Sequence, residues 1–401
     1  MSDIYYFNPT GEMAIANGFA SYMPPKALRQ FECDLALMPS YFAQEGDVVL
    51  VQDKPNESFL NIWQNIGLPI CNYITLKEAE QQKNINFIRP WSWSPACHHQ
   101  LKNLKANSSS HFKSSPNYSW QEDDKMFFSR ASCNKVQTYL QHNCKHSEVR
   151  IQKAAINVYS IDKVEQWIER NGKAVIKMPW SSSGRGVHTV DTENNRPLNK
   201  EWLRGAINAQ SFVTVEPLLQ KAKDFSYQLK LDRNGEIIFL GISHFTNDNK
   251  GHFTGGIIHW PHQTNAISEF FNEDLIQSSA QLLIEAIKSL QPHLKYEGYL
   301  GVDGIVYVDE LGQLKIHPCL DINWRYNMGN VNIQLPRFIH SNSKGVWKVV
   351  SVKKGLWNDF TEAESKKKPL IISGSKIISG FIPLTPPSSH AQFGAYIEVF
   401  Q

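Results

Sequence analysis

Short apolar runs alternate with amphipathic segments along the first third of the chain, and this alternation is typical of an α/β lobe. We expect strands at Ile4–Pro9, Asp47–Gln52 and Phe87–Pro90. The continuous apolar core of the second run suits a buried parallel strand. Helical periodicity marks residues 57–66 and 76–82. A stretch rich in Asn, Ser and Lys at 102–118 predicts a surface loop, so we place the end of this lobe at residue 124.

The central part of the chain has a denser run of strand-like segments, which predicts two further lobes of mixed α+β structure. Strands are expected at 174–178, 187–190, 211–215, 225–231, 237–243, 299–308 and 313–323. Helices are expected at 132–142, 161–171, 200–209 and 272–290. We assign a small lobe to 125–209, a large lobe to 210–345 and a C-terminal extension to 346–401, whose role the sequence does not reveal. The strand-like segment Ala395–Phe400 suits either intramolecular packing or the edge of a homodimer.

Composition narrows the class of protein. With 401 residues, of which 41% are hydrophobic and 20% charged, the chain can bury a large core. The 41 basic and 38 acidic residues leave a charge of +3 and form no long basic run, so we expect neither a nucleic-acid nor a membrane partner. Six cysteines without CxxC spacing suit free thiols, and the N-terminus lacks a secretory signal pattern. We therefore expect a cytoplasmic protein.

One segment, residues 174–187, has the pattern of a phosphate-binding hairpin. Lys177 ends an apolar strand, and a small, flexible turn leads directly into the next strand. The turn offers backbone amides and hydroxyls to a phosphate through Ser181, Ser182, Ser183, Gly184 and Gly186. A P-loop is disfavoured, because the residues after the glycines have the pattern of a strand rather than of a helix. A plain serine-glycine hairpin remains the alternative for this segment taken alone.

Two later features supply what a nucleotide site still needs. The strand at 213–216 ends in Glu216 and Pro217, where the backbone leaves strand geometry and can pair with an adenine edge. Asp224 follows and could accept hydrogen bonds from ribose hydroxyls. An ordinary strand end with a solvated acid is the alternative interpretation.

The second feature is a pair of acidic strands. Asp303 lies in an otherwise apolar strand, and Asp321, Asn323 and Arg325 alternate along the returning one, so these three side chains share a face. Mg²⁺ prefers such oxygen ligands together with nucleotide phosphates. Arg325 would neutralise charge that develops on a transferred phosphoryl group. A purely structural polar network is disfavoured, because burying two acids and an arginine without a ligand is costly.

Taken in order, these motifs resemble those of the ATP-grasp superfamily over residues 125–340. The resemblance implies ATP held between two β-sheet lobes with Mg²⁺, or Mn²⁺ as an alternative. It further implies that a small-molecule or peptide carboxylate is activated as an acyl phosphate and attacked by an amine or another nucleophile. The preceding α/β lobe fits the domain that normally comes before this fold. The implied nucleotide contacts are Arg130 (or Lys135), Lys177, the hairpin residues, Glu216, Pro217, Leu218 and Asp224. Asp303, Asp321 and Asn323 are the implied metal ligands, and Arg325, Lys177 and Arg185 the catalytic cations.

Three departures from the family pattern leave questions open. Asp321 stands where glutamate is usual, and Gly301 stands where several peptide ligases carry an arginine. The connection from Asp303 to Asp321 is also long, so a bulge near residues 317–318 or a longer hairpin must restore the register. A small-molecule kinase and a non-catalytic nucleotide sensor are therefore the alternatives to a ligase.

Substrate contacts are harder to predict from this sequence. The polar, glycine-rich segment 244–256 is a candidate substrate loop, with His244, Lys230 and Arg185 as contributors, although a long hairpin turn would have the same composition. Three polar residues near the first strand, Asn8, Glu12 and Asn17, are further candidates to face the cleft.

Overall fold

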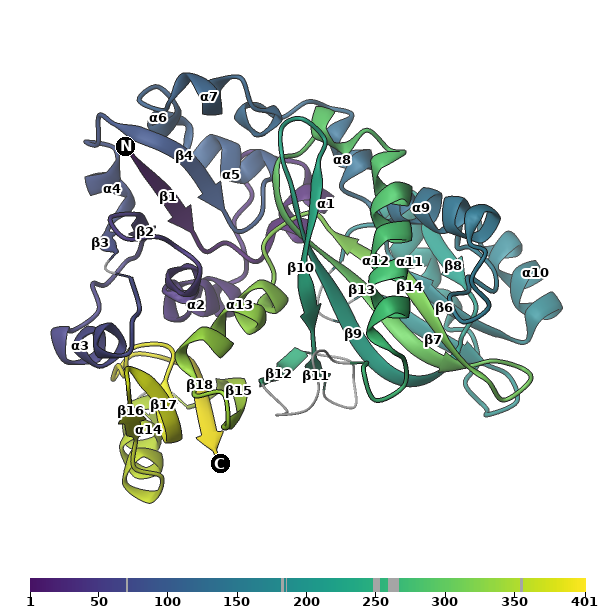
Figure 1. Cartoon of the computed structure of the whole chain (residues 1–401). Coiled ribbons are helices and arrows are strands. Elements are labelled where there is room, and N and C mark those ends of the chain that lie inside the picture. Colours follow the sequence, from purple (N-terminus) through teal and green to yellow (C-terminus); the bar gives the residue numbers. More distant parts are fainter. Residues whose placement is uncertain (70, 182–183, 185, 248–252, 259–266, 354–355) are drawn as a thin grey trace.

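A computed structural model describes residues 1–69, 71–181, 184, 186–247, 253–258, 267–353 and 356–401, and in them the strands form four sheets (Figure 1). The N-terminal sheet is wholly parallel in the order β3-β2-β1-β4. Its strands are β1 (Ser2–Tyr6), β2 (Val48–Leu50), β3 (Asn72–Ile74) and β4 (Ile85–Pro90). Its helices include α1 (Gly11–Asn17), α2 (Lys26–Asp34), α3 (Glu57–Asn65), α4 (Leu76–Ala79) and α5 (Pro95–Gln100). The expected α/β lobe is confirmed.

The surface loop expected at 102–118 is wrong. This stretch forms α6 (Lys102–Lys105), α7 (Ser110–Lys113) and the 3₁₀ turn η2 (Pro116–Tyr118), followed by α8 (Asp124–Phe127). Leu104 and Phe112 are fully buried in the main core. Each of the helices α6 and α7 therefore has one buried apolar side chain, and this burial stabilises helical structure in a stretch whose polar composition suggested a loop.

The small lobe is an antiparallel sheet in the order β5-β8-β6-β7. Its strands are β5 (Ile156–Val158), β6 (Lys173–Lys177), β7 (Val187–Asp191) and β8 (Val213–Glu216). Its two helices, α10 (Ile161–Asn171) and α11 (Lys200–Gln210), bury apolar residues in the same separate core. Because β8 belongs to this sheet, the small lobe extends past residue 209, where the sequence had suggested its end.

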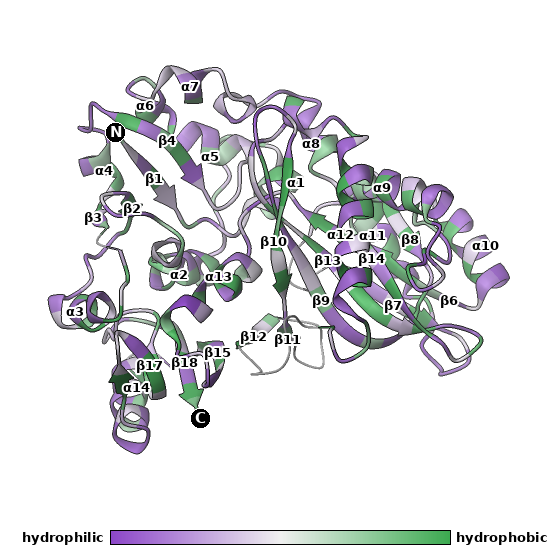
Figure 2. Ribbon diagram, viewed as in Figure 1, coloured by the Kyte–Doolittle hydropathy of each residue, from purple (hydrophilic) through white to green (hydrophobic). Residues whose placement is uncertain are grey.

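The large lobe is a second antiparallel sheet in the order β10-β9-β13-β14. It comprises β9 (Gln220–Leu231), β10 (Ile237–Ser243), β13 (Gly298–Val308) and β14 (Leu314–Asn323). Two long helices, α9 (Arg130–Asn143) and α12 (Glu273–Lys288), pack on one face of it. The chain from 130 to 143 therefore packs with this lobe, although the sequence had placed it with the small one. In Figure 2 the helices carry both hydrophilic and hydrophobic residues, as expected of helices with one buried face.

The two faces of the large sheet differ in chemistry. Phe225, Tyr227 and Leu229 on β9 point into the main hydrophobic core under the helices. The intervening Ser226 and Gln228 therefore point to the opposite face. Lys177 of the small lobe contacts the same sheet at the Leu320 carbonyl. On this polar face the strand pairing sets Asp303 directly beside Asp321. The same face carries all the predicted metal ligands.

The C-terminal extension completes a six-stranded sheet in the order β11-β12-β15-β18-β17-β16. Its strands are β11 (Phe245–Asn247), β12 (Phe253–Ile258), β15 (Lys344–Ser351), β16 (Ile371–Ser373), β17 (Lys376–Pro383) and β18 (Phe393–Phe400). The helices α13 (Met328–Gln334) and α14 (Leu356–Lys367) flank it. Because β18 lies between β15 and β17, both of its edges are paired within the chain, which decides for the intramolecular role expected of Ala395–Phe400.

This last sheet shares one hydrophobic core with the N-terminal lobe. Tyr41 Oη donates to the Leu384 carbonyl at 2.6 Å, and Trp63 Nε1 donates to the Pro383 carbonyl at 2.9 Å. The extension is thus a structural part of the first lobe. No helix in the described part of the chain is long and apolar enough to cross a membrane.

Candidate nucleotide and metal site

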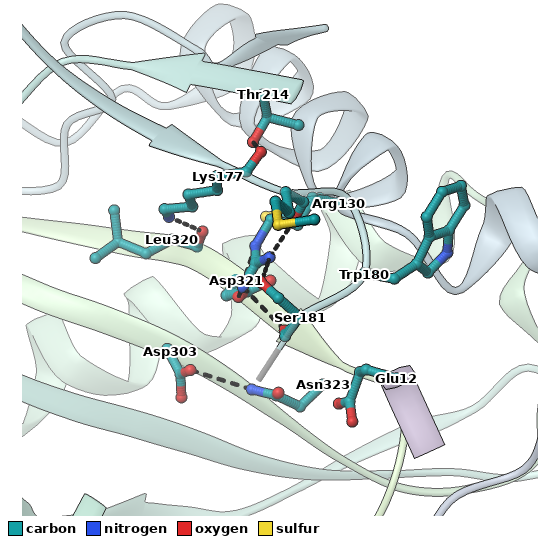
Figure 3. Close-up of polar contacts among 12 residues, drawn as sticks. Glu12, Arg130, Lys177, Trp180, Ser181, Thr214, Asp303, Leu320, Asp321 and Asn323 are labelled. Atoms are coloured by element: carbon teal, nitrogen blue, oxygen red, sulfur yellow. Dashed lines mark hydrogen bonds and ion pairs between the residues drawn. The ribbon is translucent and has the colours of Figure 1, made fainter. Parts of the chain in front are cut away.

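Arg130 lies at the start of α9, between the glycine-rich hairpin and the acidic face of the large sheet (Figure 3). Its Nη2 and Nε reach Asp321 Oδ2 at 2.5 and 3.0 Å. Its Nη1 donates to Ser181 Oγ at 2.6 Å and to the Met178 carbonyl. Burial lowers the pKa of Arg130, but the charge of Asp321, its hydrogen bond to Arg130 and the charge of Glu216 together raise that pKa by more, so the guanidinium stays charged. One buried cation therefore joins the hairpin to the acidic strand.

Lys177 makes a second bridge between the lobes. Its Nζ lies 2.5 Å from Glu216 Oε1 on the neighbouring strand β8, and it donates to the Leu320 carbonyl on β14 at 3.0 Å. Burial lowers the pKa of Lys177, but the charges of Glu216 and Asp321 outweigh burial and leave that pKa above its ordinary value. A positively charged group is thus held where the two sheets meet.

The Leu320 carbonyl is available because β14 is irregular at this point. Ile305 pairs with His317 and Asp303 pairs with Asp321, so two steps along β13 correspond to four along β14. The extra residues form the bulge that the long connection between the two acids had required. A bulge exposes backbone groups and redirects side chains, and here it returns Asp321 to the register of Asp303.

Asp303 and Asp321 form the negative end of the site. Burial, followed by the charge of Asp321, raises the pKa of Asp303 to about 6. Asn323 Nδ2 donates to Asp303 Oδ2 at 3.1 Å, and its Oδ1 accepts from Arg325 Nη2 at 3.0 Å. The described residues contain no group of three or more His, Cys, Asp or Glu side chains that could hold a metal. Two mutually repelling carboxylates beside the amide group of Asn323 nevertheless fit a hard divalent cation that also takes phosphate oxygens.

Glu12 brings the N-terminal lobe into the site. It lies in the first turn of α1, after the carboxyl end of β1, and its Oε1 pairs with Arg325 Nε. Its Oε2 is buried and has no hydrogen-bond partner among the described residues. The preceding loop is rigid, because Asn8 Nδ2 donates to the Ser92 carbonyl at 2.7 Å and Ser92 N donates back to Asn8 Oδ1 at 3.1 Å. Of the three polar residues predicted near the first strand, Glu12 reaches the cleft, Asn8 ties two strand ends together, and Asn17 is exposed.

A small cavity of about 30 Å³ lies at the junction of these elements. Its lining comes from the N-terminal lobe, the start of α9, the hairpin and β14, and includes Glu12, Arg130, Ser181, Asp321, Asn323 and Arg325. The charged side chains fill most of the space by pairing with one another. Any ligand that enters must therefore exchange these ion pairs for its own charges.

The predicted hairpin joins β6 to β7, and the structure describes part of its turn. Gly184 and Gly186 have φ angles of 72° and 70°, a left-handed conformation that favours glycine. At Gly186 a Cβ atom would lie 2.9 Å from Ser181 Cβ, so the turn is also too tight for a larger residue. Ser182, Ser183 and Arg185 lie outside the described residues.

Four of the remaining predicted residues are less closely tied to this centre. Asp224 lies on β9 opposite Ile305 and pairs with Lys221 at 2.6 Å. Lys230 lies farther along the strand, with its Nζ 5.4 Å from the ring centre of Tyr299. His244 follows β10 and Lys135 is exposed on α9, so Arg130 is the basic residue that the fold brings in from upstream.

The absent arginine at position 301 has a local cause. A Cβ atom on Gly301 would lie 2.5 Å from Asn327 Nδ2, so no larger residue fits there without movement.

The hinge residues Pro217 and Leu218 connect β8 to β9, as expected for a link between the two lobes. The contact of Lys177 with the Leu320 carbonyl was not predicted, because a contact with the backbone does not depend on the residue type.

Comparisons with known proteins bear on the fold. Neither a protein-family model nor a curated protein matches this chain. A biotin carboxylase–β,γ-ATP complex from Campylobacter jejuni is similar in structure, with a TM-score of 0.51, 10% identity, and coverage of 100% of this chain and 88% of that one. N5-carboxyaminoimidazole synthetase from Staphylococcus aureus, crystallised with ADP, gives a TM-score of 0.46 at 14% identity over 99% of this chain and 92% of that one. At such low identity the first likeness establishes the fold alone, and it confirms the fold that the motifs implied.

Proposed function

We propose that this chain, which has the ATP-grasp fold, is a Mg-ATP-dependent ligase that activates a carboxylate as an acyl phosphate for attack by an amine or another nucleophile. The observation that carries the proposal is the convergence of opposite charges at the junction of the lobes. Lys177 and Arg130 approach from one side, and Asp303 and Asp321 lie side by side on the other. Both kinds of charge are what a magnesium-bound triphosphate requires.

The ligand-free pairing suggests how the nucleotide is accommodated. Arg130 is held by Asp321, and Lys177 by Glu216, at 2.5 Å in both cases. Phosphate oxygens would take over Arg130 and would share Lys177, whose ammonium group has three donors, with Glu216. The freed Asp321 would join Asp303 and Asn323 as ligands of Mg²⁺. Bound Mg²⁺ would neutralise phosphate charge and orient the transferred group. Exchange of partners keeps every buried charge compensated in both states.

Each of these residues would have its own role in phosphoryl transfer. Lys177 and Arg130 orient the phosphate chain, with the hairpin amides beside them. Arg325, fixed by Glu12 and Asn323, would stabilise charge on the phosphoryl group as it passes to the carboxylate. No protein nucleophile is needed, because positioning and charge stabilisation account for phosphoryl transfer.

The test uses the purified protein with Mg-ATP, a panel of carboxylates and hydroxylamine, which converts an acyl phosphate into a stable hydroxamate. We expect ADP and hydroxamate to form together and only when both Mg²⁺ and a carboxylate are present. A stable phosphorylated product in place of hydroxamate would indicate a kinase. Nucleotide binding without any ADP formation across the panel would indicate a sensor, and either result would contradict the ligase.

A further inference from the structure

His317 is a buried histidine outside the hydrophobic cores. Its side chain is almost inaccessible, since the residue is only 4% exposed. Its Nδ1 atom is fully buried and has no hydrogen-bond partner among the described residues. An imidazole nitrogen left unpaired in the interior costs on the order of 1–3 kcal/mol. Such an atom in a site between two lobes leaves a hydrogen-bonding position that a ligand can fill.

His317 lies on β14 directly before the bulge. Ile316, the residue before it, belongs to the main core beneath the helices, as does Cys319 within the bulge. His317 therefore points to the opposite face of the sheet, the face that carries Asp303 and Asp321. It pairs with Ile305 in register, two residues along β13 from Asp303, which corresponds to roughly 7 Å.

The surroundings of His317 suit a flat, uncharged ring rather than a phosphate. Ile305 beside it is apolar and buried, and the ring centre of Tyr307 lies 6.5 Å away. Burial, followed by the charge of Lys177, lowers the pKa of His317 to about 3, so the imidazole is neutral at physiological pH. A neutral imidazole keeps one nitrogen as a donor and the other as an acceptor.

The charged groups assign the two ends of the cleft. Arg130 and the hairpin lie beside Asp321, which fits the phosphates. Lys177 contacts the bulge, and Glu216 marks the end of β8, where the chain passes to the large lobe. Along β13, His317 therefore lies on the side of Asp303 that is away from Asn323 and Arg325, in one row with Ile305 and Asp224. The base of a bound nucleotide would lie on this side.

We propose that His317 is the residue that identifies the base, with its Nδ1 accepting a hydrogen bond from the exocyclic amino group of adenine. This inference rests on the proposed nucleotide site and adds the group that selects adenine within it. Inosine diphosphate has the same phosphates and ribose as ADP but carries a carbonyl in place of that amino group. Two acceptors would then face each other, so the site disfavours the inosine nucleotide.

The test is calorimetric titration with MgADP and MgIDP. The wild-type protein should bind ADP about tenfold more tightly than IDP, which is the effect of one hydrogen bond. His317→Phe, which keeps a ring but no acceptor, should reduce that preference toward one. His142→Phe, on the exposed end of α9, is the matched control and should keep the wild-type preference.

The outcomes separate this inference from the proposed function. Equal affinity of the wild-type protein for ADP and IDP would overturn the role of His317. This measurement uses only the wild-type protein, so it does not depend on whether a variant folds. An unchanged preference in His317→Phe, with a normal unfolding midpoint, would overturn it as well. Failure of the wild-type protein to bind either nucleotide would instead contradict the proposed nucleotide site.

Discussion

Removing the positive charge of Lys177 should lower the folding stability of the small lobe, apart from any effect on catalysis. Lys177 and Glu216 are neighbours on β6 and β8, and their side chains are only 10% and 8% exposed. The change Lys177→Met keeps the apolar stem and deletes the charge. Glu216 is then a buried carboxylate without its partner, and an uncompensated buried charge is strongly destabilising.

The structure sets the size of the effect. At an effective dielectric constant of about 20, unit charges 2.5 Å apart attract by roughly 7 kcal/mol, part of which offsets the desolvation of both groups. We therefore expect Lys177→Met to lower the free energy of unfolding by about 3–5 kcal/mol. The double variant Lys177→Met/Glu216→Gln removes both charges and should recover most of this loss.

Urea unfolding, followed by far-UV circular dichroism, measures these free energies. Lys173→Met is the matched control, because Lys173 lies on the same strand but is itself 36% exposed; it pairs with the exposed Glu193 at 2.6 Å and lies 3.9 Å from Asp191. Its loss should cost less than about 1 kcal/mol. Neither the single nor the double variant at Lys177 should bind MgADP with wild-type affinity. A Lys177→Met protein as stable as the Lys173→Met protein, with normal nucleotide affinity, would refute both the ion pair and its role.

Three further predictions follow from local geometry. Asp321→Asn removes one of two adjacent carboxylates and should weaken Mg²⁺-dependent ADP binding at least tenfold by calorimetry, since Mg²⁺ depends on few protein ligands; unchanged affinity would contradict the metal set. Gly301→Ala places a Cβ atom 2.5 Å from a neighbouring amide and should lower the unfolding free energy by about 1–3 kcal/mol, whereas Gly205→Ala, with open space in a helix, should raise it by up to about 1 kcal/mol. Burial, followed by the charge of a nearby lysine, lowers the pKa of His98 to about 3, below that of an unfolded histidine. Stability from this group is therefore complete above about pH 6.5 and is lost toward pH 3 by up to about 1.4 kcal/mol per pH unit. His98→Phe should flatten this acid dependence of urea unfolding and exposed His99→Phe should not; equal profiles would exclude His98 as the cause.

Much of the fold was accessible from the sequence, because long apolar periodicities dominate it. The helix expected at 161–171 is α10, and the strand expected at 237–243 is β10. The loop expected at 102–118 was wrong, since each of its short helices is held by one buried apolar residue in a polar context. Helix α13, strand β15 and helix α14 were missed after residue 325, where local patterns are weak and the strand depends on pairing with distant strands.

The residues of the candidate site could be predicted where their type and spacing indicate their chemistry. Arg130, Lys177, Asp303, Asp321 and Asn323 were all named in advance, and the fold brings them together. Their mutual ion pairs were not foreseen, because the partner of a charge depends on how three lobes meet. His317 was named only as the place of a bulge, although it lies four residues before Asp321, a spacing that puts both side chains on one face of a strand.

The central claim is that Mg-ATP binds between the small and large lobes. The most direct test is calorimetric titration of the purified protein with a non-hydrolysable ATP analogue, with and without Mg²⁺. We predict saturable binding that tightens at least tenfold when Mg²⁺ is present. No binding in either condition would contradict the nucleotide site, and it would leave the glycine-rich segment as an ordinary turn in an ATP-grasp fold.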